Sequence, residues 1–228
     1  MLRILRSIAI VVTLAGCGQH SQLGGTGVYF NAKAEGQPLR PPAKILLISS
    51  VDNPASNHNF KDNSERLAFA LTTMPEGYAR EFHQELSKDL MLCGISLSVQ
   101  PVPVYYQLRT GFFEFRDTET DSERAAAVRK SKSSVAQEVA AWKPDLVLSV
   151  LEKSKMLRSG VINSMTYDVG LFDVARRQNL WSGTAIVSRG NTLISGEKAD
   201  DNGRYFADML LVELADKGLL TQCRPAAK

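Results

Sequence analysis

Short apolar runs that alternate with amphipathic segments are the feature that most constrains the fold of this chain. The run ILLISSV at 45–51 is rich in branched side chains, which is typical of a buried strand. After it, four apolar residues recur at four-residue spacing and predict an amphipathic helix that Gly94 ends. They are Tyr78, Phe82, Leu86 and Leu90. Residues 95–99 (ISLSV) alternate in polarity and predict a second strand.

The second half of the chain continues this alternation. Thr120 and Glu123 have the spacing of a capping box and predict a helix that Pro144 ends. Three strands and a last helix follow, at 145–151, 165–174, 180–187 and 204–217. The order strand, helix, strand, helix, strand, strand, strand, helix predicts a single α/β domain over 44–228. We expect a mixed sheet with crossovers early and an antiparallel meander late, covered by three helices.

The amino-terminal segment has the pattern of a secretory signal, with Arg3 and Arg6 before a short apolar run. The nine residues at 8–16 are too few to span a membrane, which takes roughly 20. The sequence LAGC at 14–17 resembles the bacterial lipobox, in which the peptide is cut before the cysteine and the cysteine carries the lipid. The resemblance implies a signal peptide at 1–16 and a lipidated Cys17. The alternative is a plain signal peptide with an incidental cysteine.

Residues 17–43 are rich in Gly, Gln and Pro and show no sustained period, so they predict a flexible tether between lipid and domain. The alternative is that Val28, Tyr29 and Phe30 pack on the domain as an edge segment. Gly18 stands where enteric bacteria place the Asp that retains a lipoprotein in the inner membrane. A periplasm-facing position on the outer membrane is therefore expected.

The net charge and the sequence motifs limit the classes of function that are expected. The net charge of +3 falls to +1 once Arg3 and Arg6 leave with the signal, so nucleic acid is not an expected partner. The sequence has no zinc-protease HExxH, no GxSxG nucleophile motif and no phosphate-binding glycine loop. We therefore expect no enzyme, no cofactor and no metal. Glu81 and Glu85 lie one helical turn apart and are interpreted as a solvated helix face.

Two cysteines remain once Cys17 is lipidated. Cys93 and Cys223 form an even pair in an oxidising compartment and lack the spacing of a metal site. They are either a disulfide or two buried thiols.

Aromatic residues suggest where a partner would bind. Phe112, Phe113 and Phe115 lie within four positions of one another, so at least one is expected near solvent beside charged neighbours, the composition of a binding hot spot. The alternative is a short edge strand that lays Phe113 and Phe115 on the core. Trp181 is a second candidate, because Leu180 and Trp181 face opposite ways in a regular strand.

The hairpin at 171–183 supplies the most specific local pattern. LFDV at 171–174 and LWSG at 180–183 resemble a hairpin that recurs in periplasm-facing lipoproteins. With the lipobox and the order of elements, the chain resembles lipoproteins that share the fold of the TolB amino-terminal domain. That group includes the curli-secretion lipoprotein CsgG and the penicillin-binding-protein activators. The pair of transmembrane hairpins used by its pore-forming members is absent from the sequence.

This resemblance implies binding or assembly rather than chemistry, and it transfers no functional residue. The expected function is a membrane-anchored, non-enzymatic accessory that binds an envelope protein. The alternative is a periplasmic module that binds a glycan or a small molecule.

Overall fold

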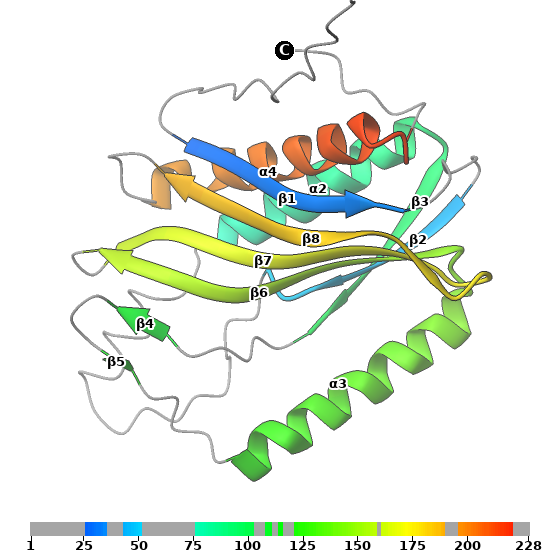
Figure 1. Ribbon diagram of the computed structural model, residues 1–228, viewed down its shortest axis with the longest axis horizontal. Coiled ribbons are helices and arrows are strands. Elements are labelled where there is room, and N and C mark those ends of the chain that lie inside the picture. The colour runs from blue at the N-terminus through cyan, green and yellow to red at the C-terminus, as the bar shows by residue number, and fades with distance from the viewer. Residues whose placement is uncertain are drawn as a thin grey trace, which may run out of the picture.

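The branched apolar run near residue 45 forms the central parallel strand of a mixed sheet in the computed structural model (Figure 1). The structure describes residues 26–35, 43–51, 76–102, 108–110, 114–115, 121–158, 161–189 and 196–220. The strands are β1 (Thr26–Ala34), β2 (Ala43–Ser49), β3 (Ile95–Pro101), β4 (Leu108–Thr110), β5 (Glu114–Phe115), β6 (Leu146–Arg158), β7 (Val161–Asp173) and β8 (Gln178–Arg189). The helices are α2 (Glu76–Leu92), α3 (Asp121–Trp142) and α4 (Gly196–Asp216).

The main path of the sheet has the order β1-β8-β7-β6-β2-β3. β2 pairs in parallel with β3 and β6, whereas β6, β7, β8 and β1 pair antiparallel. The short β4 lies beside the end of β6 and pairs with β5. The prediction of one α/β domain with a mixed sheet, early crossovers and a late meander is confirmed.

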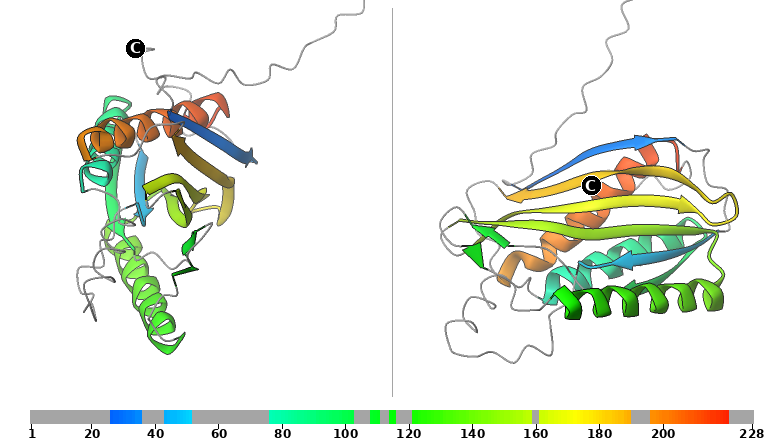
Figure 2. Two further views of the ribbon diagram at one scale, coloured as in Figure 1. Left: turned by 90° about the vertical axis from the view of Figure 1, so that its left-hand side faces the viewer. Right: turned by 60° about the horizontal axis from the view of Figure 1, so that its bottom comes forward.

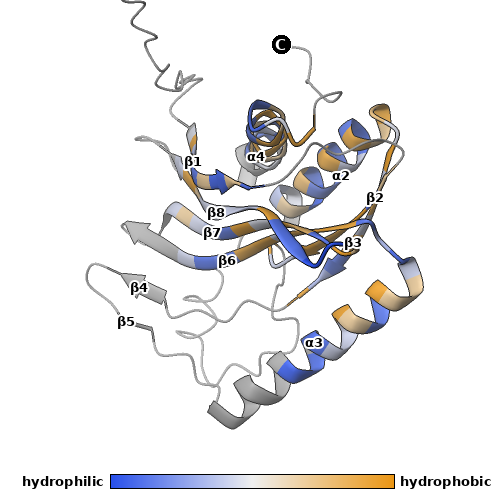
Figure 3. Ribbon diagram, turned by 45° about the vertical axis from the view of Figure 1, so that its right-hand side comes forward, coloured by the Kyte–Doolittle hydropathy of each residue, from blue (hydrophilic) through white to orange (hydrophobic). Residues whose placement is uncertain are grey.

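The three helices cover the sheet from opposite sides. Leu97 and Val99 of β3 pack on the core beneath α2 and α4, while Ser98 and Gln100 of the same strand bond to α3. Because alternate residues of a strand face opposite ways, α3 lies on the other face from α2 and α4 (Figure 2). Figure 3 shows apolar residues along β2 and on the two helices of the core side.

The core between sheet and helices is built around Phe206 of α4. Its ring stacks on Phe82 of α2, with centroids 4.9 Å apart, and on Tyr167 of β7, at 5.0 Å. All three side chains are fully buried. Burial of a large apolar side chain stabilises the fold by about 1.5–3 kcal/mol. This aromatic stack therefore joins both helices to the antiparallel half of the sheet.

The amino-terminal part of the domain departs from the prediction. The sequence pattern predicts a flexible tether over 17–43, but Thr26–Ala34 form β1 and pair with β8 along nine residues. The alternative of an edge segment at Val28–Phe30 describes what is found. The strand is held because Val28 is buried on the core and Phe30 packs against it, which compensates the entropy of ordering the chain.

In the described part of the chain, none of the helices is long and apolar enough to cross a membrane.

Candidate functional site

Polar side chains are buried where β2 ends. Among the described residues, the buried polar ones are Ser49, Ser50, Glu152 and Asn202. Ser49 is the last residue of β2 and Ser50 follows it, whereas Glu152 lies in β6, the neighbouring parallel strand. Burying polar groups costs free energy unless they are hydrogen-bonded, so a group of them in an apolar core calls for a specific explanation.

The position of this group in the topology is that of a ligand site in open α/β sheets. From β2 the chain crosses through α2 to β3 on one side, while β6 lies on the other side and leads to β7. Ligands bind in such sheets outside the carboxyl ends of the strands, where the strand order reverses. Ser49, Ser50 and Glu152 lie at that point, and we call them, with His83, the switch-point cluster.

Ser49 links β2 to helix α2. Its Oγ lies 2.9 Å from Nε2 of His83 and accepts the backbone N–H of Val51 at 3.2 Å. Burial lowers the pKa of His83 to about 4, so the imidazole is neutral near pH 7 and can accept the Ser49 proton. Burial is the cause of that shift, and Ser49 is only 1% exposed. Among the described residues the pair has no orienting acid, and its burial denies it the access of a nucleophile–base pair, so its geometry suits a polar link.

A hydrogen bond between Glu152 and Ser50, the residue after Ser49, joins β6 to the end of β2. The backbone N–H of Glu152 donates to Oγ of Ser50 at 2.5 Å, next to a register shift between Glu152 and Ser154. Burial raises the pKa of Tyr78, the Glu152 carboxylate raises it further, and an interaction with the Tyr167 hydroxyl lowers it. Tyr78 therefore stays protonated at any physiological pH and supplies a hydroxyl beside a buried carboxylate.

The neutral state of His83 gives a testable pH dependence. Unfolded histidine has a pKa near 6.5, and the folded value is about 4. Between these pH values the unfolded chain binds a proton that the folded chain does not. Stability is therefore lost as pH falls, by up to about 1.4 kcal/mol per pH unit. Urea unfolding at pH 7.5 and 5 is expected to show a smaller loss in His83→Gln than in the wild type. Equal losses would contradict this, since other titrating groups are shared by both proteins.

Glu81 and Glu85 do not form the solvated face that the sequence predicted. Their side chains are each only 12% exposed, because α4 packs beside α2. Glu81 contacts Arg204 of α4 at 2.7 Å, and this hydrogen bond is the main cause that lowers the Glu81 pKa. Local sequence patterns do not reveal this pair, because its partners are 123 positions apart.

A carboxylate cluster lies at the same helix contact. Glu85, Asp89 and Asp208 bring oxygen atoms within 4.8 Å of one another. Lys88 contacts Glu85 at 2.9 Å, and the charges of Asp89 and Asp208 also raise the Lys88 pKa. The Lys88 ammonium group therefore already provides a positive charge beside these carboxylates.

Trp181 is not the surface residue that the sequence predicted. It is 1% exposed and Leu180 is 2% exposed, so both are buried. The pairing with β7 shifts between Leu171 and Phe172, where Leu171 faces Trp181 and Phe172 faces Asn179. A bulge of this kind breaks the strict alternation of a strand, so neighbouring residues can both reach the core. Phe30 of β1 packs on the Trp181 ring, with centroids 6.2 Å apart.

The other predicted site residues have different outcomes. Cys93 takes part in a disulfide, but Cys17 and Cys223 lie outside the described residues, so the pairing of Cys93 with Cys223 stays a prediction. Phe112 and Phe113 also lie outside them. Phe115 belongs to the short strand β5, opposite Leu108. The hot spot at these phenylalanines therefore stays a prediction as well.

Comparison with known proteins shows no family. No protein-family model matches the chain, and no curated protein matches it significantly. Among solved structures, the chain is similar to the PelC dodecamer from Paraburkholderia phytofirmans, with 12% identity and a TM-score of 0.39 over 84% of this chain and 98% of that chain. A variant of the same dodecamer matches with 11% identity and a TM-score of 0.37, over 78% of this chain and 94% of that one. TM-scores this low support no inference about fold or function.

Proposed function

We propose that this chain is a bacterial lipoprotein, anchored at Cys17, that binds an envelope protein as a non-enzymatic accessory on the periplasmic side of the outer membrane. The observation that carries the proposal is the sequence LAGC at 14–17 behind a basic and then apolar segment. Binding rather than catalysis is favoured because the serine–histidine contact found among the described residues, Ser49 with His83, is buried and has no orienting acid within that part of the chain.

The start of β1 supports close attachment to the membrane. Eight residues, 18–25, separate Cys17 from Thr26. Fully extended, they span at most about 26–29 Å. The domain is therefore held by its edge strand within one domain diameter of the lipid.

Replacement of Cys17 tests the anchor. In Cys17→Ser, we expect a precursor that keeps residues 1–16 and takes up no fatty-acid probe, because the lipidated thiol is missing. Labelling of cells with an alkynyl fatty acid and intact-mass measurement of the purified protein check both features. Cys93→Ser is the matched control and should be labelled like the wild type. If Cys17→Ser is cut and labelled as before, the lipobox assignment is wrong.

A partner is sought by crosslinking in whole envelopes, followed by purification of the lipoprotein. We expect a stoichiometric protein partner, and Phe112→Ala is expected to release it, since Phe112 is the predicted contact residue beside Glu114 and Arg116. Ile186→Ala removes a described apolar side chain that is 41% exposed on β8 and serves as the control. Full recovery of the partner with Phe112→Ala would place the contact surface elsewhere.

A second candidate function is a binding module for a glycan or small molecule. The observation in its favour is the switch-point cluster, whose place at the carboxyl end of β2 is where α/β sheets bind ligands. Recovery of a bound metabolite instead of a protein partner would favour this candidate. The loss of that metabolite in Ser50→Ala would assign it to the cluster.

A further inference from the structure

We infer that one turn of α3 contacts anionic phospholipid headgroups of the membrane that carries the lipid anchor. This turn consists of Arg129, Lys130 and Lys132, and we call it the basic turn. The inference rests on the proposed anchoring at Cys17 and adds a second attachment of defined chemistry.

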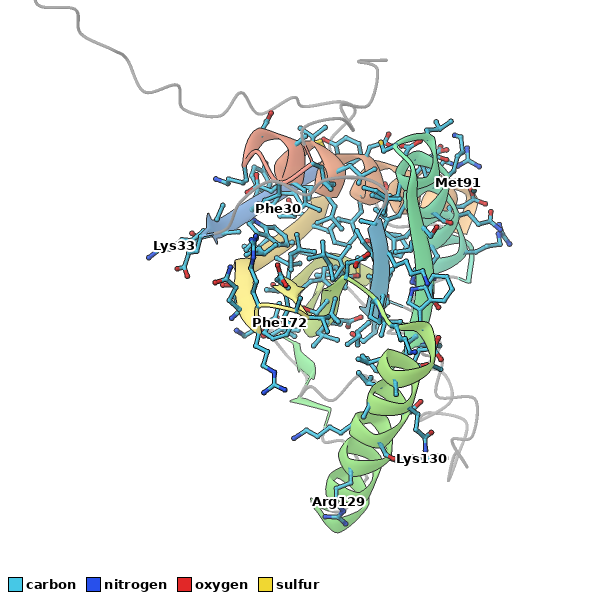
Figure 4. All side chains as sticks on the ribbon, turned by 90° about the vertical axis from the view of Figure 1, so that its right-hand side faces the viewer. Phe30, Lys33, Met91, Arg129, Lys130 and Phe172 are labelled. Carbon is cyan, nitrogen blue, oxygen red and sulfur yellow. The ribbon has the colours of Figure 1, made fainter. Side chains whose placement is uncertain are left out.

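The basic turn is open to solvent. All three side chains are exposed, and among the described residues none of them has an acidic partner. Figure 4 shows Arg129 and Lys130 on the part of α3 that projects from the body of the domain. The whole segment 121–132 has four basic and two acidic residues, a net charge of +2. Its potential is therefore positive toward an approaching surface.

Contacts with β3 fix where the basic turn lies along the sheet. Glu138 accepts a hydrogen bond from Ser98 at 3.3 Å, and Ser134 bonds to Gln100 at 3.1 Å. α3 therefore runs antiparallel to β3, and Ser134 already lies beside the last residues of that strand. The preceding turn, which contains Lys130, lies about 6 Å further along the helix and so passes the carboxyl end of β3.

The opposite end of α3 is fixed near the start of the parallel strands. The ammonium group of Lys44 in β2 lies 5.1 Å from the centroid of the Trp142 ring. Asp145, just after the helix, donates its backbone N–H to the carbonyl of Lys44. The direction of α3 is therefore determined at both of its described contacts with the sheet.

The lipid anchor enters at the same end of the sheet as the basic turn. β8 runs in the same direction as β3, because β7 lies antiparallel between β6 and β8. Thr26, the first residue of β1, pairs with Arg189, the last residue of β8. Five strand spacings of about 4.8 Å separate β1 from β3, roughly 24 Å. The eight residues before Thr26 can span that width, so one membrane surface can meet both Cys17 and the basic turn.

The chemistry of the turn favours a lipid surface over a protein surface. Protein interfaces gather binding energy from buried aromatic and apolar anchors, whereas the exposed side chains described next to the basic turn, Ser133 and Ala136, are small, and Val135 is half-buried. A diffuse anionic surface needs only clustered cations, each of which raises membrane binding about five-fold. Lipid chains and basic clusters often act together to hold proteins on membranes.

The test uses the full-length lipidated protein in phosphatidylcholine vesicles, with or without phosphatidylglycerol. A fluorophore on Ser133→Cys, an exposed position of α3, reports contact through quenching by headgroup-labelled lipid. We expect strong quenching only with phosphatidylglycerol, and loss of it at about 1 M salt, where the Debye length is near 3 Å. The variant Arg129→Glu, Lys130→Glu, Lys132→Glu should lower the ratio of contacting to free states by more than roughly 100-fold, because loss of the three cations alone gives that factor.

The control reverses three exposed cations at the other end of the sheet, at Lys33, Lys143 and Arg177, and should leave the quenching unchanged. Flotation of the same vesicles reports the anchor separately. Three results would show that the inference is wrong while the anchor stands, each in a protein that still floats. Quenching could be absent, it could be equally strong in vesicles without phosphatidylglycerol, or the control variant could reduce it as much as the reversal of the basic turn does. If reversal of the basic turn releases a protein partner but leaves quenching intact, the turn binds protein instead. If the protein does not float at all, both the lipid anchor and the membrane contact of the basic turn are wrong.

Discussion

Replacing Gly203 with alanine is expected to lower the free energy of unfolding by about 3 kcal/mol, the upper end of the usual cost of overpacking. A Cβ at this position in α4 would overlap the carbonyl oxygen of Tyr78 and lie 3.0 Å from the backbone nitrogen of Phe82, both in α2. These are backbone atoms, so relief requires the two helices to move apart. Overpacking of a dense core typically costs about 1–3 kcal/mol and occasionally more, and here the shift would also disturb the stack of Phe206 on Phe82.

The sign of this effect is what makes the test informative. In an open helix, alanine in place of glycine stabilises by about 1 kcal/mol, so a destabilised Gly203→Ala protein reports close contact between α2 and α4. Urea unfolding followed by circular dichroism measures the change. Asp201→Ala, at an exposed site of the same helix, should alter stability by no more than about 0.5 kcal/mol. Unchanged or higher stability in Gly203→Ala would show that the helices are not packed this tightly.

Periodicity predicted most of the fold because the parallel strands and α2 carry strong local patterns. The run at 45–51 is apolar on both faces, and the helix after it ends at Leu92, next to Gly94, whose φ of 73° suits glycine. β1 was predicted only as an alternative, because its pattern is weak. Its inward residues, Val28 and Phe30, flank Tyr29 in a short run bounded by Gly27 and Asn31, and they become a strand only through pairing with β8.

The switch-point cluster was not predictable, because long-range pairing creates it. Ser49 and His83 are 34 positions apart, and Ser50 meets Glu152 across 102 positions. Each residue has an ordinary local context: two serines end an apolar run, and a histidine lies at the rim of a helix stripe. A weak signal was present in the order of elements, since β2 lies between β3 and β6, the two strands that the crossovers through α2 and α3 reach.

Trp181→Ala is expected to cost roughly 3–5 kcal/mol of unfolding free energy, the usual range for removing a large buried aromatic side chain. The indole ring is 1% exposed and contacts Phe30 of β1. Its loss therefore leaves a cavity between β8 and the edge strand β1. The Trp181 ring reaches the core because the pairing of β7 with β8 is irregular at Leu180. The loss of stability in Trp181→Ala therefore also tests this irregular pairing.

Two further substitutions separate packing from other causes. Ile186→Ala removes an apolar side chain that is 41% exposed on the same strand and should cost less than about 1 kcal/mol. Trp181→Phe keeps a ring in the core and removes an indole N–H that has no acceptor within the described part of the chain. It should therefore be clearly more stable than Trp181→Ala. If Trp181→Ala unfolds at the wild-type urea midpoint but loses the crosslinked partner, Trp181 is an interface residue after all. If stability falls strongly while each folded molecule still recovers the partner, Trp181 is a core residue that holds β1 on the sheet.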